Sequence, residues 1–369
     1  KKRAVNLMIR SSNDIIRDLL WRNVDFVRAE DGELAFTREG AHSTSRILFH
    51  EDITGKEISS KLLAQVRNRS NITIMENTTM LDIIEKDNTC YGIIAAGEND
   101  TLYAITAPYT LWACGGIGGL YTHSTNYRQL TGDALAIALN HNIELEHPDY
   151  IQIHPTTLYS SKPGRRFLIS ESVRGEGAVL LNEKGERFTD ELQPRDVVAA
   201  AIFNEMEKEN SNHVWLSLAP IDEAVIQNHF PNIYEHCLEE GYDVTKEPIP
   251  VVPAQHYFMG GIKVDHESRT TMDNLYAIGE TACNGVHGRN RLASNSLLES
   301  LVFAKRAALD ITENAVVKPT QDEITYFDTF DAEKYADESK IDGEYAKLVN
   351  KKIEEADKAY EESQKKNYA

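Results

Sequence analysis

The feature that most constrains the fold is an interruption in the pattern of secondary structure. Residues 1–147 and 263–315 alternate between helix-like and strand-like periodicity, whereas 148–262 has a different texture. Glycine and proline become frequent there, and histidine, arginine and glutamate residues stand close together. A chain that leaves one pattern and later returns to it is typical of one domain inserted into another. We therefore predict a split domain that carries residues 148–262 as an insert.

Local periodicity predicts the individual elements outside this insert. We expect helices over 15–20, 59–66, 132–140 and 294–311, and strands over 72–75, 90–95, 101–105, 109–113 and 274–278. The three strands between 90 and 113 would form a β-meander. The C-terminal part, 316–369, is rich in Asp, Glu, Lys and Tyr. It predicts a solvated surface helix or partial disorder, with Tyr345, Val349, Ala356 and Tyr360 on one helical face.

Charge and cysteine content exclude several classes of protein. The 369 residues carry a net charge of −19, so bulk attraction to nucleic acid or to an anionic membrane is excluded. No apolar run approaches the roughly 20 residues of a membrane-spanning helix. The four cysteines are scattered without a CxxC pair, which excludes a disulfide scaffold and an obvious zinc site. This cysteine usage fits a reducing cytoplasm.

A glycine cluster follows the predicted strand at 109–113. Gly115, Gly116, Gly118 and Gly119 have the spacing GGxGG, and no GxGxxG occurs anywhere in the chain. Glycines after a strand can cradle a phosphate, or they can form a tight turn as the chain leaves the strand. The spacing favours the turn, so the glycines alone do not identify a dinucleotide site.

The residues suited to chemistry cluster within and just after the predicted insert. Arginine side chains recognise carboxylates with two parallel hydrogen bonds, and several arginines here accompany histidines in a strongly acidic chain. Each residue also has an ordinary structural role open to it, such as a buried histidine or a surface ion pair. Taken together they predict a site for a dicarboxylate or a phosphate. They are His154, Ser170, Glu171, Arg174, Arg195, His256 and Arg291.

Six motifs at these positions resemble the flavoprotein family of L-aspartate oxidase, fumarate reductase and succinate dehydrogenase. They are QIHPT, ESVRGEGA, PRDVVAAAI, HYFMGGI, YAIGE and VHGRNRLASNSLLE, in the order of the family. Within it, the loop TREGAHS and the sequence NRLASNSL are most similar to L-aspartate oxidases, because the dehydrogenases usually carry Gly-Gly where Ala-Ser stands here. The resemblance implies an α/β fold: a split FAD-binding domain of the fumarate reductase type with an inserted α+β capping domain.

The resemblance also implies an activity, FAD-dependent oxidation of L-aspartate to iminoaspartate. Oxygen or fumarate would accept the electrons, and the product would feed NAD synthesis in the cytoplasm, with quinolinate synthase as an expected partner. Glu39 would recognise the substrate ammonium, and His154, Ser170, His256 and Arg291 the two carboxylates. Arg195 would be the acid/base, with Glu171 and Arg174 as its proton relay. The positions that match cofactor contacts are Asp133, Glu280, Ser296 and Leu297.

Two departures from the family pattern leave other functions open. The family begins with a strand and a GxGxxG helix that hold the FAD pyrophosphate, and neither that segment nor the C-terminal helical domain of L-aspartate oxidases is recognisable here. We therefore expect the chain as given to bind FAD weakly or not at all. The alternatives are a fumarate reductase or succinate dehydrogenase flavoprotein, and a non-catalytic remnant without cofactor.

Overall fold

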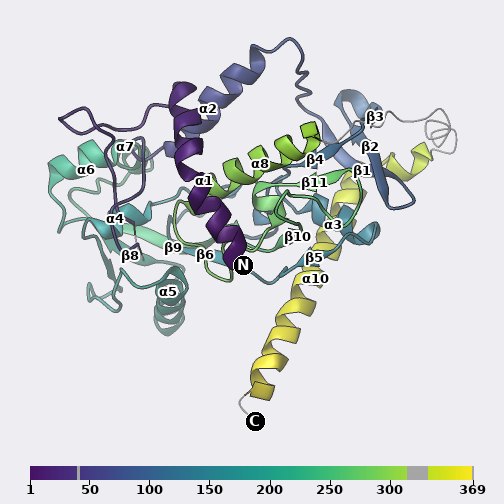
Figure 1. Ribbon diagram of the computed structural model, residues 1–369. Helices are drawn as coiled ribbons and strands as arrows, with labels where there is room; N and C mark the ends of the chain where they lie inside the picture. Colours follow the sequence, from purple (N-terminus) through teal and green to yellow (C-terminus); the bar gives the residue numbers. More distant parts are fainter. Residues whose placement is uncertain (40–41, 314–330, 368–369) are drawn as a thin grey trace.

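The computed structural model of the protein describes residues 1–39, 42–313 and 331–367. Its middle part, on the left in Figure 1, is built on an antiparallel four-stranded sheet in the order β6-β9-β8-β7. The strands are β6 (Ile151–Leu158), β7 (Val179–Leu181), β8 (Val214–Ser217) and β9 (Ile249–Phe258). The accompanying helices are α4 (Glu171–Gly175), α5 (Arg195–Glu209), α6 (Glu223–His229) and α7 (Pro231–Glu239).

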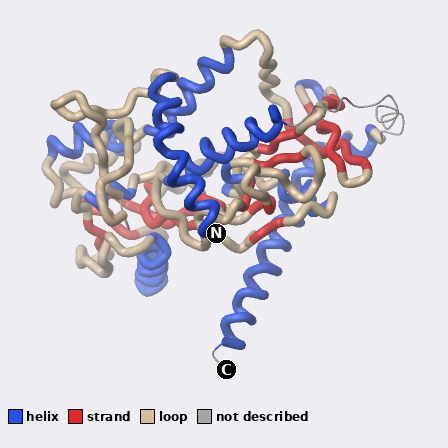
Figure 2. Tube along the Cα trace, in the orientation of Figure 1, coloured by secondary structure: helices blue, strands red, loops and turns tan. Residues whose placement is uncertain are grey.

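The remaining sheets join segments from before and after this middle part. β4 (Thr110–Trp112) pairs in parallel with β11 (Leu275–Ala277), and β10 (Gly261–Lys263) lies between β5 (Leu145–Glu146) and β12 (Ala282–Cys283). An antiparallel meander consists of β1 (Thr79–Lys86), β2 (Thr89–Ala96) and β3 (Leu102–Thr106). Pairing across the insert is what a split domain requires. Figure 2 shows these strands as a second group, to the right of those of the middle part.

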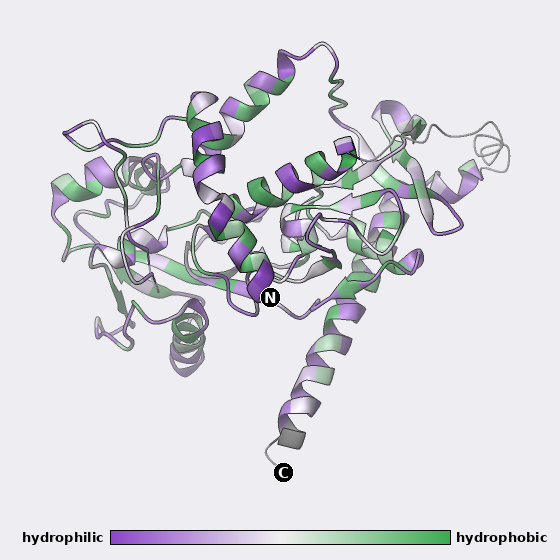
Figure 3. Ribbon diagram, in the orientation of Figure 1, coloured by the Kyte–Doolittle hydropathy of each residue, from purple (hydrophilic) through white to green (hydrophobic). Residues whose placement is uncertain are grey.

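Helices complete this second unit. They are α1 (Lys2–Trp21), α2 (Thr54–Arg67), α3 (Asp133–Asn140), α8 (Asn295–Glu313) and α10 (Glu338–Asn367), with short 3-10 turns η1 (Glu98–Asp100), η2 (Gly118–Leu120), η3 (Gly279–Thr281) and η5 (Ala332–Tyr335). α1 lies against α8 through buried Met8, Leu19, Val302 and Phe303. Figure 3 shows the two sides of α1 as alternating purple and green bands, as expected of a helix with one apolar face.

The middle part has an apolar core of its own. Buried side chains between Leu158 and Val251 form one cluster, whereas Trp112 lies in a second core, formed mainly by the second unit and joined by Phe258 at the end of β9. The first cluster falls inside the predicted insert 148–262. The boundaries of that insert at 147/148 and 262/263 stay a prediction.

Two strand predictions were wrong. Residues 72–75 form no strand, and Ile72, Ile74 and Met75 are more than two-fifths exposed. No strand within the described ranges pairs with them, so their backbone groups make no ladder hydrogen bonds and face solvent instead. The predicted meander was misplaced by one strand, because β1 takes part in it and β4 pairs with β11 instead.

The C-terminal helix is less solvated than the sequence indicates. Ile341, Tyr345, Val349 and Ile353 of α10 are buried in the core that contains α3, while Tyr360 is exposed. Just before α10, Lys334 and Tyr335 donate hydrogen bonds to the carboxylate of Asp82 on β1, at 2.8 and 2.7 Å. The far end of α10 projects from the body (Figure 1). The predicted unit 316–369 includes residues 316–330, which lie outside the described residues.

Candidate functional site

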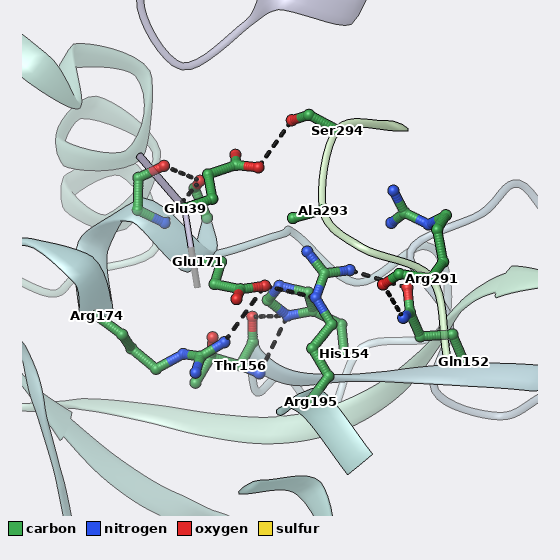
Figure 4. A network of polar contacts seen from close by, with 12 residues as sticks. Glu39, Gln152, His154, Thr156, Glu171, Arg174, Arg195, Arg291, Ala293 and Ser294 are labelled. Carbon is green, nitrogen blue, oxygen red and sulfur yellow. Dashed lines mark hydrogen bonds and ion pairs between the residues drawn. The ribbon is translucent and has the colours of Figure 1, made fainter. Parts of the chain in front are cut away.

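Three predicted catalytic residues meet below the surface of the middle part. Arg195 is the first residue of α5, and Glu171 begins α4, whose N-cap Ser170 accepts a hydrogen bond from the Ser172 amide at 3.3 Å. Arg195 Nε donates to Glu171 Oε2 at 2.5 Å, and Arg174 Nη2 lies 3.9 Å from the same oxygen (Figure 4). All three side chains are less than a tenth exposed. One carboxylate therefore bridges two buried guanidinium groups.

In this triad the negative charge of Glu171 lies beside the positive charges of Arg174 and Arg195. Burial raises the pKa of Glu171, but the charges of Arg195 and Arg174 outweigh that effect and hold it below its ordinary value. Burial lowers the pKa of Arg174 to about 10, although Glu171 opposes this. Arg174 Nη1 donates to the Glu191 carbonyl at 2.6 Å, whereas its Nε and Nη2 have no hydrogen-bond partner among the described residues. Two positive charges thus share one negative charge in a buried place.

Gln152 connects the triad to the loop that carries Arg291. Arg195 Nη1 donates to Gln152 Oε1 at 3.0 Å, and Gln152 Nε2 donates to the Arg291 carbonyl at 2.7 Å. Gln152 belongs to the QIHPT motif, but no role was predicted for it from the sequence. A signal was present, because residues two apart on a strand share a face and Gln152 stands two before His154.

The two predicted histidines lie on neighbouring strands, His154 on β6 and His256 on β9. Their rings are 5.1 Å apart, centroid to centroid. His154 Nδ1 contacts the backbone of Thr156, and His256 Nδ1 lies 2.8 Å from the Thr125 hydroxyl. Burial, reinforced by Arg195, lowers the pKa of each ring well below 6.5. Both histidines are therefore neutral near pH 7 and each keeps Nε2 for another partner.

The guanidinium group of Arg291 is positioned to bind an anion. Its guanidinium carbon lies 4.7 Å from the centre of the Tyr257 ring, and Nη1 donates to Ser296 at 3.2 Å. Burial lowers its pKa to about 10. Nε is buried without a partner among the described residues. A buried guanidinium N–H without an acceptor is costly, so its position favours binding of a carboxylate.

Two cavities open onto these residues. The larger, about 1440 Å³, is lined by Glu39, Ser170 and Ser294, and the smaller, about 310 Å³, by His256 and Arg291. They adjoin, because Arg165, Leu168 and Leu297 line both. The other predicted residues, His154, Glu171, Arg174 and Arg195, line neither cavity. Four substrate candidates, Glu39, Ser170, His256 and Arg291, thus surround a shared space, whereas His154 and the catalytic candidates are buried outside it.

Glu39 faces this space from the opposite loop. Its carboxylate accepts a hydrogen bond from Ser294 at 2.8 Å, drawn at the top of Figure 4. The Ser294 backbone has φ 61°, in the left-handed region that non-glycine residues seldom adopt. Ser294 belongs to the Ala-Ser pair of NRLASNSL, but its contact with Glu39 was not predicted from the sequence.

The predicted cofactor residues fall into two places. Glu280, Ser296 and Leu297 line the smaller cavity. Glu280 Oε1 accepts from the Phe258 amide at 2.8 Å, and burial raises its pKa from 4.5 to about 7. Asp133 does not line this cavity. It begins α3, accepts a hydrogen bond from Thr131 at 2.6 Å, and has its pKa raised by burial.

The glycine cluster packs against the chain itself. A Cβ on Gly116 would lie 2.5 Å from Glu280 Oε1, and one on Gly119 would lie 2.2 Å from the Arg128 carbonyl oxygen. These glycines allow close approach of protein segments, which agrees with the tight-turn interpretation. Elsewhere in the described ranges, no group of three or more His, Cys, Asp and Glu side chains is placed to hold a metal ion.

Comparison with known proteins decides the family. The FAD binding domain family matches residues 1–297. The chain is 53% identical over 309 residues to the L-aspartate oxidase of Clostridium perfringens and 52% identical over 314 residues to that of Clostridium acetobutylicum. These matches cover 84% and 85% of this chain, and 70% and 72% of the relatives. The chain belongs to the L-aspartate oxidase family.

Solved structures agree with this assignment. A structure of Escherichia coli quinol fumarate reductase FrdA matches with a TM-score of 0.83 and 30% identity, over 91% of this chain and 61% of that one. A quinol-fumarate reductase with menaquinol molecules matches with a TM-score of 0.82 and 31% identity, over 88% and 61%. The predicted FAD-binding fold of the fumarate reductase type is confirmed, and the L-aspartate oxidase family is one of FAD-dependent oxidoreductases. This chain spans about three-fifths of those structures.

The comparisons leave the role of each site residue, and the expectation of weak FAD binding, as predictions. Dicarboxylate substrates fit both kinds of relative. Among the helices in the described ranges, none combines the length and hydrophobicity that crossing a membrane requires.

Proposed function

We propose that this site oxidises L-aspartate to iminoaspartate. The observation that carries the proposal is that one carboxylate, Glu39, lines the larger cavity, which adjoins the smaller cavity lined by Arg291 and His256. A purely cationic site would suit succinate or fumarate. L-aspartate carries an ammonium group as well, and that group needs an anion beside it.

The chain offers matching partners for both carboxylates. Arg291 has an unpaired buried Nε, and neutral His256 can donate from Nε2 while its Nδ1 accepts from the Thr125 hydroxyl. The ring of His154 stands 5.1 Å from that of His256 and lies outside both cavities. Ser170 lines the larger cavity and adds a hydroxyl donor. Together these groups would hold a dicarboxylate by its two ends, with the reacting carbon between them.

Arg195 is the group that we propose moves the proton. Oxidation of aspartate removes a hydride from the α-carbon and a proton from the nitrogen, and reduction of fumarate adds a hydride and a proton to its two central carbons. An arginine seldom acts as a base because its pKa exceeds about 12 in water. Here Arg174 and Arg291 add positive charge nearby, and Glu171 contacts Arg195 Nε at 2.5 Å as a route for the proton.

The smaller cavity fits the reactive end of FAD. Ser296 and Leu297 lie in the first turn of α8, and Glu280 and Ser300 face the same space, next to Arg291 and His256. Backbone N–H groups at a helix start suit polar acceptor atoms. The chemistry that bound FAD supplies is acceptance of the hydride. Oxygen or fumarate would then take the electrons.

The wider biological context belongs to the same proposal. Iminoaspartate hydrolyses readily as a free imine, so transfer to quinolinate synthase is the use that we propose for it, within NAD synthesis in the cytoplasm. The resemblance to quinol fumarate reductase keeps fumarate reduction as the second candidate function. The two differ in their need for an anion at the ammonium position.

The experiment that tests the proposal is Glu39→Gln in protein saturated with added FAD, because the chain as given is expected to bind FAD weakly. Losing a charge-assisted hydrogen bond of about 1.5–3 kcal/mol should raise the KM for aspartate roughly 10- to 150-fold. Fumarate reduction should be unchanged or improved, because fumarate has no ammonium group. Steady-state kinetics of both reactions on one preparation would show this split.

Glu51→Gln is the matched control for this substitution. Glu51 is exposed and lines the same larger cavity, but no hydrogen bond of its carboxylate reaches the 291–294 loop. This control should leave both reactions as in the wild type. If Glu39→Gln lowers the two activities in parallel, Glu39 has a structural role and the fumarate reductase assignment gains ground.

A further inference from the structure

His42 stands three residues beyond Glu39 on the loop that faces the larger cavity. Its side chain is only 2% exposed, although Ser43, Thr44 and Ser45, which follow it, are exposed. The His42 amide donates to the Glu39 carbonyl at 3.2 Å, and Arg38 Nε donates to the His42 carbonyl at 2.8 Å. The backbone of His42 is thus tied to Glu39, which carries the proposed ammonium-binding carboxylate, and to Arg38 before it.

The ring contacts of His42 define its protonation state. Arg46 Nε lies 3.0 Å from His42 Nδ1, and a guanidinium nitrogen can only donate. Nδ1 must therefore be the acceptor, which leaves the proton on Nε2. That nitrogen lies 3.1 Å from the carbonyl oxygen of Ala293, so it donates there. Both ring nitrogens are therefore bonded to the protein, although His42 is one of the residues that line the larger cavity.

Ala293 precedes Ser294, the residue whose hydroxyl donates to Glu39. Two hydrogen bonds therefore join the same two loops side by side, one from His42 to Ala293 and the other from Ser294 to Glu39. The second loop also carries Arg291. Holding the two loops together fixes the distance between the proposed site for the ammonium and the proposed site for a carboxylate.

We propose that His42 is a positioning residue for substrate specificity: it holds Glu39 at the distance from Arg291 that an amino dicarboxylate needs. The proposal rests on the proposed function, because it assumes that Glu39 receives the ammonium group. It goes further, because it assigns a role in specificity to a buried histidine whose ring nitrogens are bonded to Arg46 and Ala293. That role is discrimination between aspartate and dicarboxylates without an amine.

Binding to FAD-loaded protein tests this role without relying on turnover. Two probes suit titration calorimetry with oxidised protein: 2-methyl-L-aspartate, which has no hydrogen on the reacting carbon, and fumarate. His42→Ala should weaken binding of 2-methyl-L-aspartate about tenfold, near the lower end for a lost charge-assisted hydrogen bond. Fumarate binding should stay within about twofold of the wild type.

Two further variants separate positioning from a general loss of structure. A glutamine amide can still donate to the Ala293 carbonyl, so His42→Gln should recover most of the lost affinity. His229→Ala, a histidine that lines the same cavity without a contact to either loop, should behave as the wild type. Equal weakening of both probes by His42→Ala would overturn the proposal, and so would unchanged binding of both.

A double substitution separates this inference from the proposed function. In a Glu39→Gln background, His42→Ala should cause no further loss for 2-methyl-L-aspartate, because the group it positions is no longer charged. If Glu39→Gln itself leaves binding of that probe unchanged, the proposed function fails. If Glu39→Gln weakens binding and His42→Ala does not, only the role of His42 is wrong.

Discussion

Ser294 donates a hydrogen bond of 2.8 Å to Glu39 from a backbone conformation, φ 61°, that suits glycine better than serine. A non-glycine residue held there costs roughly 1 kcal/mol. According to the resemblance drawn from the sequence, the dehydrogenases of the family usually carry Gly-Gly where Ala293 and Ser294 stand here. Ser294 therefore has a strained backbone conformation, and its hydroxyl makes a contact that orients the Glu39 carboxylate.

Ser294→Gly should separate stability from specificity. Glycine adopts φ 61° without strain, so the thermal midpoint should stay the same or rise. The KM for aspartate should rise about 2- to 12-fold, as expected for one hydrogen bond of about 0.5–1.5 kcal/mol. Ala293→Gly keeps the hydroxyl and is the control. A lower midpoint with an unchanged KM would show that the serine is there for packing.

The positions of the proposed catalytic residues were predictable because each motif is local. Glu171 and Arg174 are three apart on one turn, and Arg195 follows a proline at a helix start, so the sequence predicted their positions. Contacts between distant segments were not predictable. Nothing in TREGAHS or RLASN indicates that Ser294 meets Glu39 across 255 residues.

The errors in the fold have the same origin. Ile72–Met75 has the composition of a strand, but strand formation depends on a neighbour that local propensity cannot supply. β1 was overlooked because a bulge between Met80 and Asp82 breaks its alternation and because Asp82 places a charge in its apolar run. That charge is satisfied by Lys334 and Tyr335, about 250 residues further on, which the tail composition did not reveal.

Arg195→Leu should abolish aspartate oxidation and fumarate reduction together in FAD-loaded protein. Both reactions need a proton to move next to the carbon that exchanges the hydride, from the substrate nitrogen in one and to a central carbon in the other, and removal of an acid/base group typically costs about 10²–10⁴-fold in rate. Arg187→Leu removes a guanidinium that is 57% exposed and should leave both rates near wild type. Half the wild-type rate in either direction after Arg195→Leu would exclude it as the proton carrier.

Asp82→Asn should loosen the C-terminal helix. Burial raises the pKa of Asp82, but hydrogen bonds from His141, Lys334 and Tyr335 to its carboxylate outweigh burial and hold the pKa below 3.8. The hydrogen bond to Asp82 raises the pKa of His141 above 6.5. The stabilisation is therefore complete between about pH 3.8 and 6.5. It declines below that window as Asp82 takes up a proton, and above it as His141 loses one.

Urea unfolding across this pH range would measure the effect. The expected loss in Asp82→Asn is about 1.5–3 kcal/mol inside the window, the usual value for hydrogen bonds to a charged group. Asp14→Asn is the control, since the Asp14 side chain is 68% exposed and pairs only with Arg17. Equal stability of Asp82→Asn and the control at pH 5.5 would mean that α10 is held by its apolar face alone.

Glu280 gives a prediction of opposite sign. Burial raises its pKa from 4.5 to about 7, so the folded protein binds a proton that the unfolded chain releases within that interval. The stability contributed by protonated Glu280 is fully present below pH 4.5 and is lost as pH rises through about 7. Glu280→Gln is permanently neutral and should remove this part of the pH dependence.

Thermal midpoints of the two proteins without FAD should therefore diverge between pH 5 and 8, with the glutamine variant the more stable at the upper end. Parallel curves would show that Glu280 is ionised throughout, with its charge balanced by Arg291.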